Sequence, residues 1–238
     1  MNKLGPFITN GTASPFYARK EIEIEKEIDS ASIKICGLGQ FVLHINGNKV
    51  GDHELDPGWT DYSKVIEYVT FDVTDYLCSG KNVVGVEVGN GWFIKNDEHY
   101  TFTFPGFMPP NPNPYKPFGK CLVLAFELTL SYKDGTVREI YADDSFKVMK
   151  HPVIQSNVYG SETFDLTLIQ DGWDNPQFND NDWEAAQIVS EKEEPSGELI
   201  EQINPPIKVI KSYQAKFLHH LDRVNLEEGL TDVKENDP

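Results

Sequence analysis

Cysteine is scarce in this sequence, and its placement excludes two kinds of site. The chain of 238 residues has only Cys36, Cys78 and Cys121, and none of them lies in a Cys-x-x-Cys motif. An odd number of widely spaced cysteines gives no basis for a disulfide framework or a thiolate metal site. We therefore interpret the three as buried, reduced thiols.

Positive charge and long apolar runs are also lacking. Lys and Arg number 21 against 38 Asp and Glu, which gives a formal net charge of −17 without a basic cluster. Such a chain is a poor partner for nucleic acid or an anionic membrane surface. No apolar run approaches the ~20 residues of a membrane span, and the first residues have no signal-peptide core. We expect a soluble, cytoplasmic protein.

Helical periodicity is nearly absent, whereas strand patterns recur at short intervals. Isoleucine alternates with charge in residues 18–28, and Asn46-Gly47 stands between two extended runs. Asp134-Gly135 likewise follows a long strand and precedes a return strand at about 136–142. Both dipeptides are typical of tight hairpins. Thr74 is expected to cap a single helical turn that Gly80 ends. The pattern predicts an all-β antiparallel sandwich or jelly roll.

Two stretches interrupt the strand pattern and suggest domain limits. Residues 94–119 are rich in proline and aromatic residues, which predicts a long ordered loop. An acidic run and Pro205-Pro206 suggest that residues 191–212 are a linker with a short strand at 207–210. We expect a lead-in over 1–16, a sandwich over 17–190 and an acidic, partly disordered tail over 213–238.

Several sequence blocks carry a family resemblance. They are INGNKVG (45–51), PGWTDY (57–62), DVTDYL (72–77), GKNVVGVEVGNGW (80–92), YKDGT (132–136) and the block from Ser156 to Trp183. Together they resemble the amino-terminal β-sandwich module of bacterial α-L-rhamnosidases of glycoside hydrolase family 78, over residues 17 to about 190. The resemblance implies a jelly-roll, galactose-binding-like sandwich. It also implies that the catalytic (α/α)6 barrel of the family is absent from this chain. Asn90 and Thr167 depart from the Asp and Arg usual at those positions.

Three functions follow from the resemblance. The first is a non-catalytic module that recognises L-rhamnose in a glycan or glycoside, attached to the catalytic domain of the same enzyme. The second is a structural module that packs against the barrel without binding sugar. The third and weakest is rhamnosidase activity of this chain alone. Glu162 and Asp165 lie near each other in the last block, but a spacing of three along a strand places them on opposite faces. We assign no catalytic residue.

The residues best suited to a sugar lie in two turns. Sugar sites combine an aromatic face with amide or carboxylate groups that bond hydroxyls. Trp59 has Asp56 and Asp61 beside it, and Trp92 follows Asn90. These five residues are the candidate carbohydrate site, with the alternative that each tryptophan is a plug in the core. Trp173 and Trp183 are expected to be strand-end anchors.

Calcium is a possible cofactor, because some modules of the resembled family bind sugar through this ion. Hard oxygen ligands are frequent in residues 95–98, 141–145 and 179–183. None of these stretches has EF-hand spacing, and solvated acidic turns are the alternative. No ligand set follows from the sequence.

Overall fold

The computed structural model describes residues 4–94, 118–156 and 162–214. In these residues the chain forms 17 strands and two short 3-10 helices, η1 (Thr74–Tyr76) and η2 (Leu166–Leu168), without an α-helix. No helix among them is long and apolar enough to cross a bilayer. The chain divides into two compact units, residues 1–208 and 209–238, and the first contains the sandwich. The predicted all-β class is confirmed.

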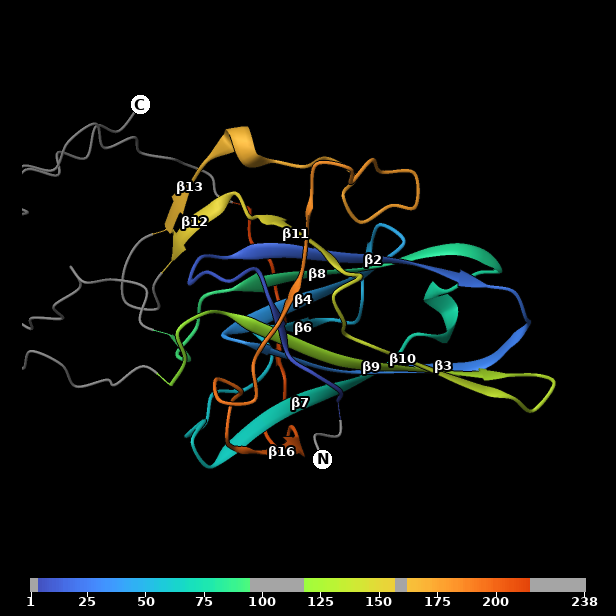
Figure 1. Cartoon of the computed structure of the whole chain (residues 1–238), viewed down its shortest axis with the longest axis horizontal. Helices are drawn as coiled ribbons and strands as arrows, with labels where there is room; N and C mark the ends of the chain where they lie inside the picture. Colours follow the sequence, from blue (N-terminus) through green and yellow to red (C-terminus); the bar gives the residue numbers. More distant parts are fainter. Residues whose placement is uncertain (1–3, 95–117, 157–161, 215–238) are drawn as a thin grey trace, which may run out of the picture. The chain divides into compact units, whose positions relative to one another are not determined.

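Two stacked sheets form the sandwich (Figure 1). The order of the first sheet is β15 (Gln187–Ile188), β1 (Ile8–Thr9), β9 (Val123–Tyr132), β3 (Ile28–Leu38), β7 (Val65–Asp72) and β16 (Glu198–Glu201), and β10 (Val137–Tyr141) also pairs with β9. The order of the second is β14 (Glu184–Ala185), β11 (Lys147–Lys150), β2 (Phe16–Ile24), β8 (Gly80–Gly89), β4 (Gln40–Ile45) and β5 (Asn48–Lys49).

Two smaller pairs complete the described strands. They are β12 (Val153–Ser156) with β13 (Glu162–Phe164), and β6 (His53–Glu54) with β17 (Ile207–Lys208). Among the described strand pairs, β7 with β16 is parallel and the others are antiparallel. The sandwich is therefore antiparallel except at one edge of its first sheet.

The two predicted hairpins are confirmed. Asn46 (φ 51°) and Gly47 (φ 82°) join β4 to β5 with the two positive φ angles of a type I′ turn. Gly135 (φ 82°) forms the turn from β9 to β10. The prediction that Thr74 caps a helical turn is wrong. Thr74 is instead the first residue of η1, whose N-cap Val73 makes no side-chain bond.

The core lies between the sheets and is built by alternation along their strands. Ile33 and Ile35 of β3 and Phe126 of β9 are almost fully buried, and so is Val86 of β8 in the opposite sheet. The rings of Phe126 and Phe146 meet edge-on with centroids 5.1 Å apart. Each such side chain stabilises the fold by about 1.5–3 kcal/mol through its removal from water.

A segment that we call the strap, residues 170–183, forms a second apolar cluster with sheet two. Trp173 and Trp183 of the strap are 7% and 4% exposed and pack with Tyr17 of β2. The neighbours of Tyr17 in β2, Phe16 and Ala18, belong to the main core. Because side chains alternate along a strand, the strap covers the outer face of the sheet. Both tryptophans are therefore anchors; Trp183 directly precedes β14 as predicted, whereas Trp173 lies in a turn and not at a strand end.

The structure also shows strands in stretches where a lead-in and a linker were predicted. β1 lies within residues 1–16 and pairs with β9 and β15. β16 lies within 191–212 and pairs with β7, and the short strand predicted at 207–210 is β17. Most of the loop predicted at 94–119 and most of the tail lie outside the described residues. The domain limits themselves stay a prediction.

The predicted burial of the cysteines is correct for Cys36 and wrong for Cys78. The Cys36 thiol is fully buried, and this burial raises its pKa. Cys78 is exposed and Cys121 is partly buried. All three are free thiols.

Candidate functional site

Trp59 and Trp92 stack against each other at the surface, and we call them the tryptophan pair. Their ring centroids lie 5.1 Å apart and their planes differ by 21°. Trp92 is partly buried against the main core, whereas Trp59 is 67% exposed. Trp59 is therefore not a core plug. The pair presents the flat face of Trp59 to solvent, and the inner ring, that of Trp92, packs on the sandwich.

Strand β4 brings the two tryptophan-bearing loops together. Gln40, the first residue of β4, pairs with Gly89 of β8, just before the Trp92 loop. Phe41 donates its backbone N–H to the Asp56 carbonyl oxygen at 2.8 Å, just before the Trp59 loop. The loops therefore flank one strand end although they are more than 30 residues apart in sequence. Local sequence alone could not reveal that contact.

The close approach of Gly39 and Gly91 fixes the Trp92 loop. A Cβ atom at Gly39 would lie 2.3 Å from the Gly91 nitrogen, closer than real Cβ contacts allow. Only glycine fits there, because any side chain would push the two backbones apart.

Aromatic rings also join the two tryptophan-bearing loops, through buried Tyr62 and Phe93 and the more exposed Phe118. Tyr62 is 2% exposed, and its ring meets those of Phe93 and Phe118 edge-on at 5.5 and 5.3 Å. Burial raises the pKa of the Tyr62 phenol. Tyr62 follows Trp59 by three residues and Phe93 follows Trp92 directly. The two loops that carry the tryptophan pair are consequently joined by packed aromatic side chains as well as by β4.

Asp56 and Asn90, two of the predicted sugar contacts, have partners within the protein. Asp56 is 4% exposed and its carboxylate lies 2.8 Å from His53 Nδ1. Burial raises the pKa of Asp56, although the hydrogen bond from His53 opposes that shift. The Asn90 amide donates to the Ala13 carbonyl at 3.2 Å, and its oxygen accepts from the Ser156 N–H at 3.3 Å. Both side chains thus support the backbone beside the tryptophan pair.

Asp61 is the exposed member of the predicted polar set. Its carboxylate pairs with Lys64 Nζ at 2.8 Å and accepts from Ser63 Oγ at 2.6 Å. These bonds lower the pKa of Asp61 to about 2. Asp61 is therefore ionised at neutral pH, two residues from Trp59. Direct contact of Asp56, Asp61 and Asn90 with a sugar stays a prediction.

The acidic stretches considered for calcium do not form a cation site in the described residues. Asp180 pairs with the Arg19 guanidinium, and Asp143 accepts both from Lys20 Nζ at 2.8 Å and from Ser145. No group of three or more His, Cys, Asp or Glu among the described residues is placed to hold a metal ion. Residues 95–98 lie outside them. Asp143 and Asp180 are therefore engaged by cationic side chains of the protein itself.

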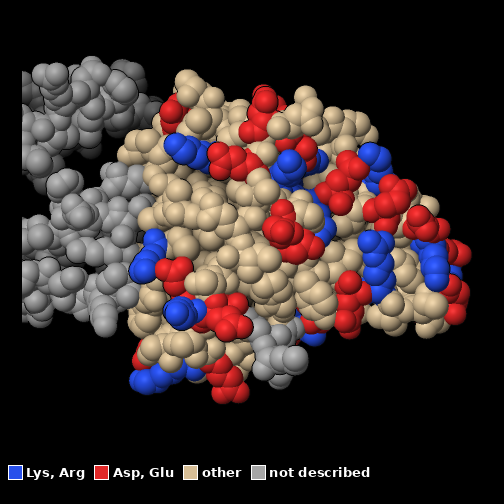
Figure 2. Space-filling model, in the orientation of Figure 1, with Lys and Arg blue, Asp and Glu red and all other residues tan. Residues whose placement is uncertain are grey.

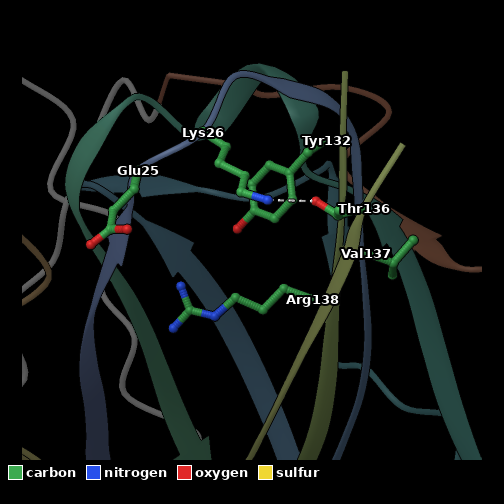
Figure 3. Close-up of a pocket in the computed structure, with 6 residues that line it drawn as sticks. All are labelled: Glu25, Lys26, Tyr132, Thr136, Val137 and Arg138. Carbon is green, nitrogen blue, oxygen red and sulfur yellow. Dashed lines mark hydrogen bonds between the residues drawn. The ribbon is translucent and has the colours of Figure 1, made fainter. Parts of the chain in front are cut away.

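A hollow elsewhere on the sandwich contains none of the predicted residues (Figure 3). Its volume is about 230 Å³, and it is lined by Glu25, Lys26, Tyr132, Thr136, Val137 and Arg138. Lys26 Nζ donates to Thr136 Oγ1 at 2.9 Å, and Arg138 donates to the Glu23 carbonyl at 2.8 Å. Both cations are engaged, and the hollow is smaller than a usual ligand pocket.

A polar cluster under the strap was missed by the sequence analysis. Glu87 of β8 accepts from His151 Nε2 at 2.8 Å and lies 3.3 Å from His44 Nε2. The Nδ1 atom of His44 lies 2.9 Å from the carboxylate of Asp174 in the strap. Each residue comes from a different segment, so no motif could identify the cluster. It joins the strap to sheet two.

The carboxylate pair considered for catalysis consists of surface residues. Glu162 lies exposed on β13. Asp165 caps η2, where its Oδ1 accepts from the Thr167 N–H at 2.9 Å. The structure thus shows a local structural role for Asp165.

Comparison with known proteins matches the chain to a family model and to curated relatives. The family model described as "Alpha-L-rhamnosidase N-terminal domain" matches residues 26–211. A curated alpha-L-rhamnosidase of Formosa agariphila is 33% identical over 210 residues, which are 88% of this chain and 21% of that protein. One from Streptomyces avermitilis is 28% identical and covers 80% of this chain and 17% of its own length. The chain therefore spans about a fifth of the length of these curated relatives.

Solved structures agree with the sequence matches. An alpha-L-rhamnosidase structure from Dictyoglumus thermophilum has a TM-score of 0.74 and 29% identity, over 89% of this chain and 24% of that one. The Streptomyces avermitilis alpha-L-rhamnosidase complexed with L-rhamnose has a TM-score of 0.71 and 27% identity, over 84% of this chain and 18% of that one.

Proposed function

The chain belongs to the family of alpha-L-rhamnosidase N-terminal domains, and from that premise we propose that it is a non-catalytic, L-rhamnose-recognising module of an α-L-rhamnosidase. Its ligand would be a rhamnose-containing glycan or glycoside. The rest of the same enzyme, including its catalytic domain, would be its other partner. The module would hold the substrate near the catalytic domain.

The exposed tryptophan pair is the observation that carries the proposal. A stacked pair offers a rigid apolar face, which suits the C–H face and methyl group of a 6-deoxy sugar. Trp59 has only two side-chain torsions to order, so binding costs little conformational entropy. Asp61 stands close by in sequence as an ionised acceptor for sugar hydroxyl groups.

Calorimetric titration of the chain with L-rhamnose, with and without Ca²⁺, tests this function. We expect Trp59→Ala to weaken binding about tenfold, which corresponds to about 1.4 kcal/mol. Trp92→Ala should weaken it similarly, because Trp59 then loses the ring that supports it. Leu166→Ala is the matched control, since Leu166 is a large apolar residue with 74% exposure on η2. Binding that is equal in all four proteins would contradict the proposed site.

A structural role is a second candidate because exposed apolar residues also occur on β12, β13 and η2. These residues, which we call the apolar patch, are Ile154 of β12, Phe164 of β13, and Leu166 and Ile169 at η2, and their exposed fractions range from 41% to 74%. Large apolar side chains that gather on a surface commonly mark an interface. In this alternative the patch packs against the catalytic domain.

Sedimentation of the chain mixed with a separately produced rhamnosidase barrel domain tests the second candidate. Leu166→Asp should abolish the complex, because a carboxylate would be buried without a partner. Trp59→Ala serves as the control and should leave it intact. A complex that survives Leu166→Asp would exclude this patch as the contact.

A further inference from the structure

The Trp59 loop is attached at its base to a strand far away in sequence. The Gly58 backbone N–H donates to the Gln202 side-chain oxygen at 2.8 Å, across 144 residues. Gln202 directly follows β16, and its own N–H donates to the Tyr68 carbonyl of β7 at 2.8 Å. The residue before Trp59 therefore depends on the end of β16 for its hydrogen-bond partner.

Buried Glu67 closes the other side of Gly58. Glu67 of β7 is 1% exposed, and its Oε1 lies 3.5 Å from the Ile203 nitrogen, which donates to it. Its Oε2 has no hydrogen-bond partner among the described residues. A Cβ atom at Gly58 would lie 2.5 Å from that oxygen. The carboxylate thus sits directly against the Gly58 backbone, and a side chain at that position would require Glu67 to shift.

The residue after Trp59 is also attached to β7. Thr60 Oγ1 donates to the Val65 carbonyl at 2.5 Å. Trp59 is therefore exposed between two fixed neighbours, Gly58 and Thr60. A surface ring that is fixed on both sides loses little freedom when it binds a ligand.

Strand β16 supports the Trp59 loop mainly through its hydrogen bonds, because it buries little apolar surface. Its residues Glu198–Glu201 are exposed or partly buried, and they pair with Val65–Tyr68 of β7 in parallel register. A slip of one residue would turn Gln202 away from Gly58, because side chains alternate along a strand. The pairing of β16 with β7 consequently determines whether Gly58 has its acceptor.

We propose that Gln202 and Glu67 are positioning residues for the tryptophan pair, holding Gly58 so that the Trp59 ring stays stacked on Trp92. The relevance of this contact to sugar binding rests on the proposed function, whereas the positioning itself does not. Under this proposal, the residue that directly follows β16 helps to position the surface that binds the ligand.

Circular dichroism of the full chain tests the positioning without any ligand. Stacked indoles give an exciton couplet, and Trp173 with Trp183 contributes one as well because those rings are also stacked, at 6.4 Å. The contribution of the tryptophan pair to the couplet is therefore the difference between the spectra of wild type and Trp59→Phe.

Gln202→Met keeps the volume and removes the acceptor of Gly58, together with the donor to the Asn204 carbonyl, and we expect it to diminish that contribution. Gln170→Met is the matched control, at a partly buried glutamine of the strap.

Titration with L-rhamnose then separates the two proposals. Gln202→Met should weaken binding about fivefold, a typical effect of one lost hydrogen bond, and Gln170→Met should not. An unchanged couplet in Gln202→Met would overturn the positioning whether or not sugar binds. A diminished couplet in a protein that binds no sugar would uphold the positioning and contradict the proposed function.

A double-mutant cycle at Gly58 and Glu67 keeps the test decisive if Gln202→Met fails to fold. Gly58→Ala should diminish the couplet, because its Cβ meets the Glu67 carboxylate. In a Glu67→Ala background the same change should have a smaller effect, because the obstructing oxygen is gone. Equal effects in both backgrounds would show that Glu67 does not position the loop.

Discussion

At the scale of single residues, Arg19 holds the strap to sheet two. Its side chain is almost completely buried, and its guanidinium pairs with Asp180. The Nε atom donates to the Trp173 carbonyl at 2.9 Å, and Nη2 donates to the Asn175 carbonyl at 3.2 Å. Burial lowers the pKa of Arg19, but the side chain remains a cation because its usual pKa is so high. One residue thus satisfies three acceptors of the strap.

We expect Arg19→Met to lower the free energy of unfolding by about 3 kcal/mol, because two buried carbonyls and Asp180 lose their partner. Urea unfolding measures the loss. Arg138→Met is the control, since Arg138 lies exposed on β10 and donates to a single carbonyl. Equal losses in the two variants would contradict the anchoring role.

At the scale of elements, the packing of the strap on sheet two depends on titratable groups. Burial lowers the pKa of His44, but bonds and charges from Glu87 and Asp174 outweigh it and raise the pKa overall. Burial raises the pKa of Glu87, but His151 and His44 lower it to about 2. The Tyr17 ring packs beside His151, with centroids 4.5 Å apart. The strap is therefore attached through charges that change with pH.

The pKa shifts of Glu87 and His44 predict opposite pH dependences of the unfolding free energy. Glu87 has a folded pKa of about 2, below its usual 4.5, so its stabilisation is complete above pH 4.5 and is lost as the pH falls toward 2. His44 has a raised pKa, so its stabilisation is complete below its usual 6.5 and is lost as the pH rises through the raised value. The cluster should contribute most between these limits.

Unfolding free energies measured across this pH range, in wild type and Glu87→Gln, check the prediction. The unfolding free energy of the variant should depend less on pH at both the acidic and the basic end of the range. An amide in place of the Glu87 carboxylate neither titrates nor attracts a charged His44. As a control, Glu198→Gln alters an exposed carboxyl of β16 outside the cluster and should keep the wild-type profile. A Glu87→Gln profile parallel to that of wild type would contradict the role of the cluster.

At the scale of the whole molecule, acidic side chains outnumber basic ones, and the two kinds are mixed on the face in view (Figure 2). Figure 2 shows Lys and Arg side chains lying singly among Asp and Glu on the face in view. This distribution agrees with the net charge of −17, and it offers no basic surface there for a polyanion.

Truncation tests which strands belong to the sandwich. A chain ending at Lys208 keeps the first compact unit and should retain its thermal midpoint. A chain ending at Gly197 loses β16, with its bonds to β7, and the Gln202 acceptor of Gly58. We expect the shorter chain to be less stable by about 1–3 kcal/mol and to lose the couplet of the tryptophan pair. Equal midpoints and couplets would show that β16 is dispensable.

The sequence by itself determined the all-β class, both hairpins and the anchoring of Trp173 and Trp183, because alternation and positive-φ turn residues act locally. It also placed the functional candidate in the Trp59 and Trp92 turns. Only the tertiary structure decided that Trp59 is exposed and stacked, since β4 brings its loop beside that of Trp92. The bond from Gly58 to Gln202, which spans 144 residues, likewise depends on the parallel pairing of β7 with β16. Such contacts arise from the packing of remote strands, so no local pattern encodes them.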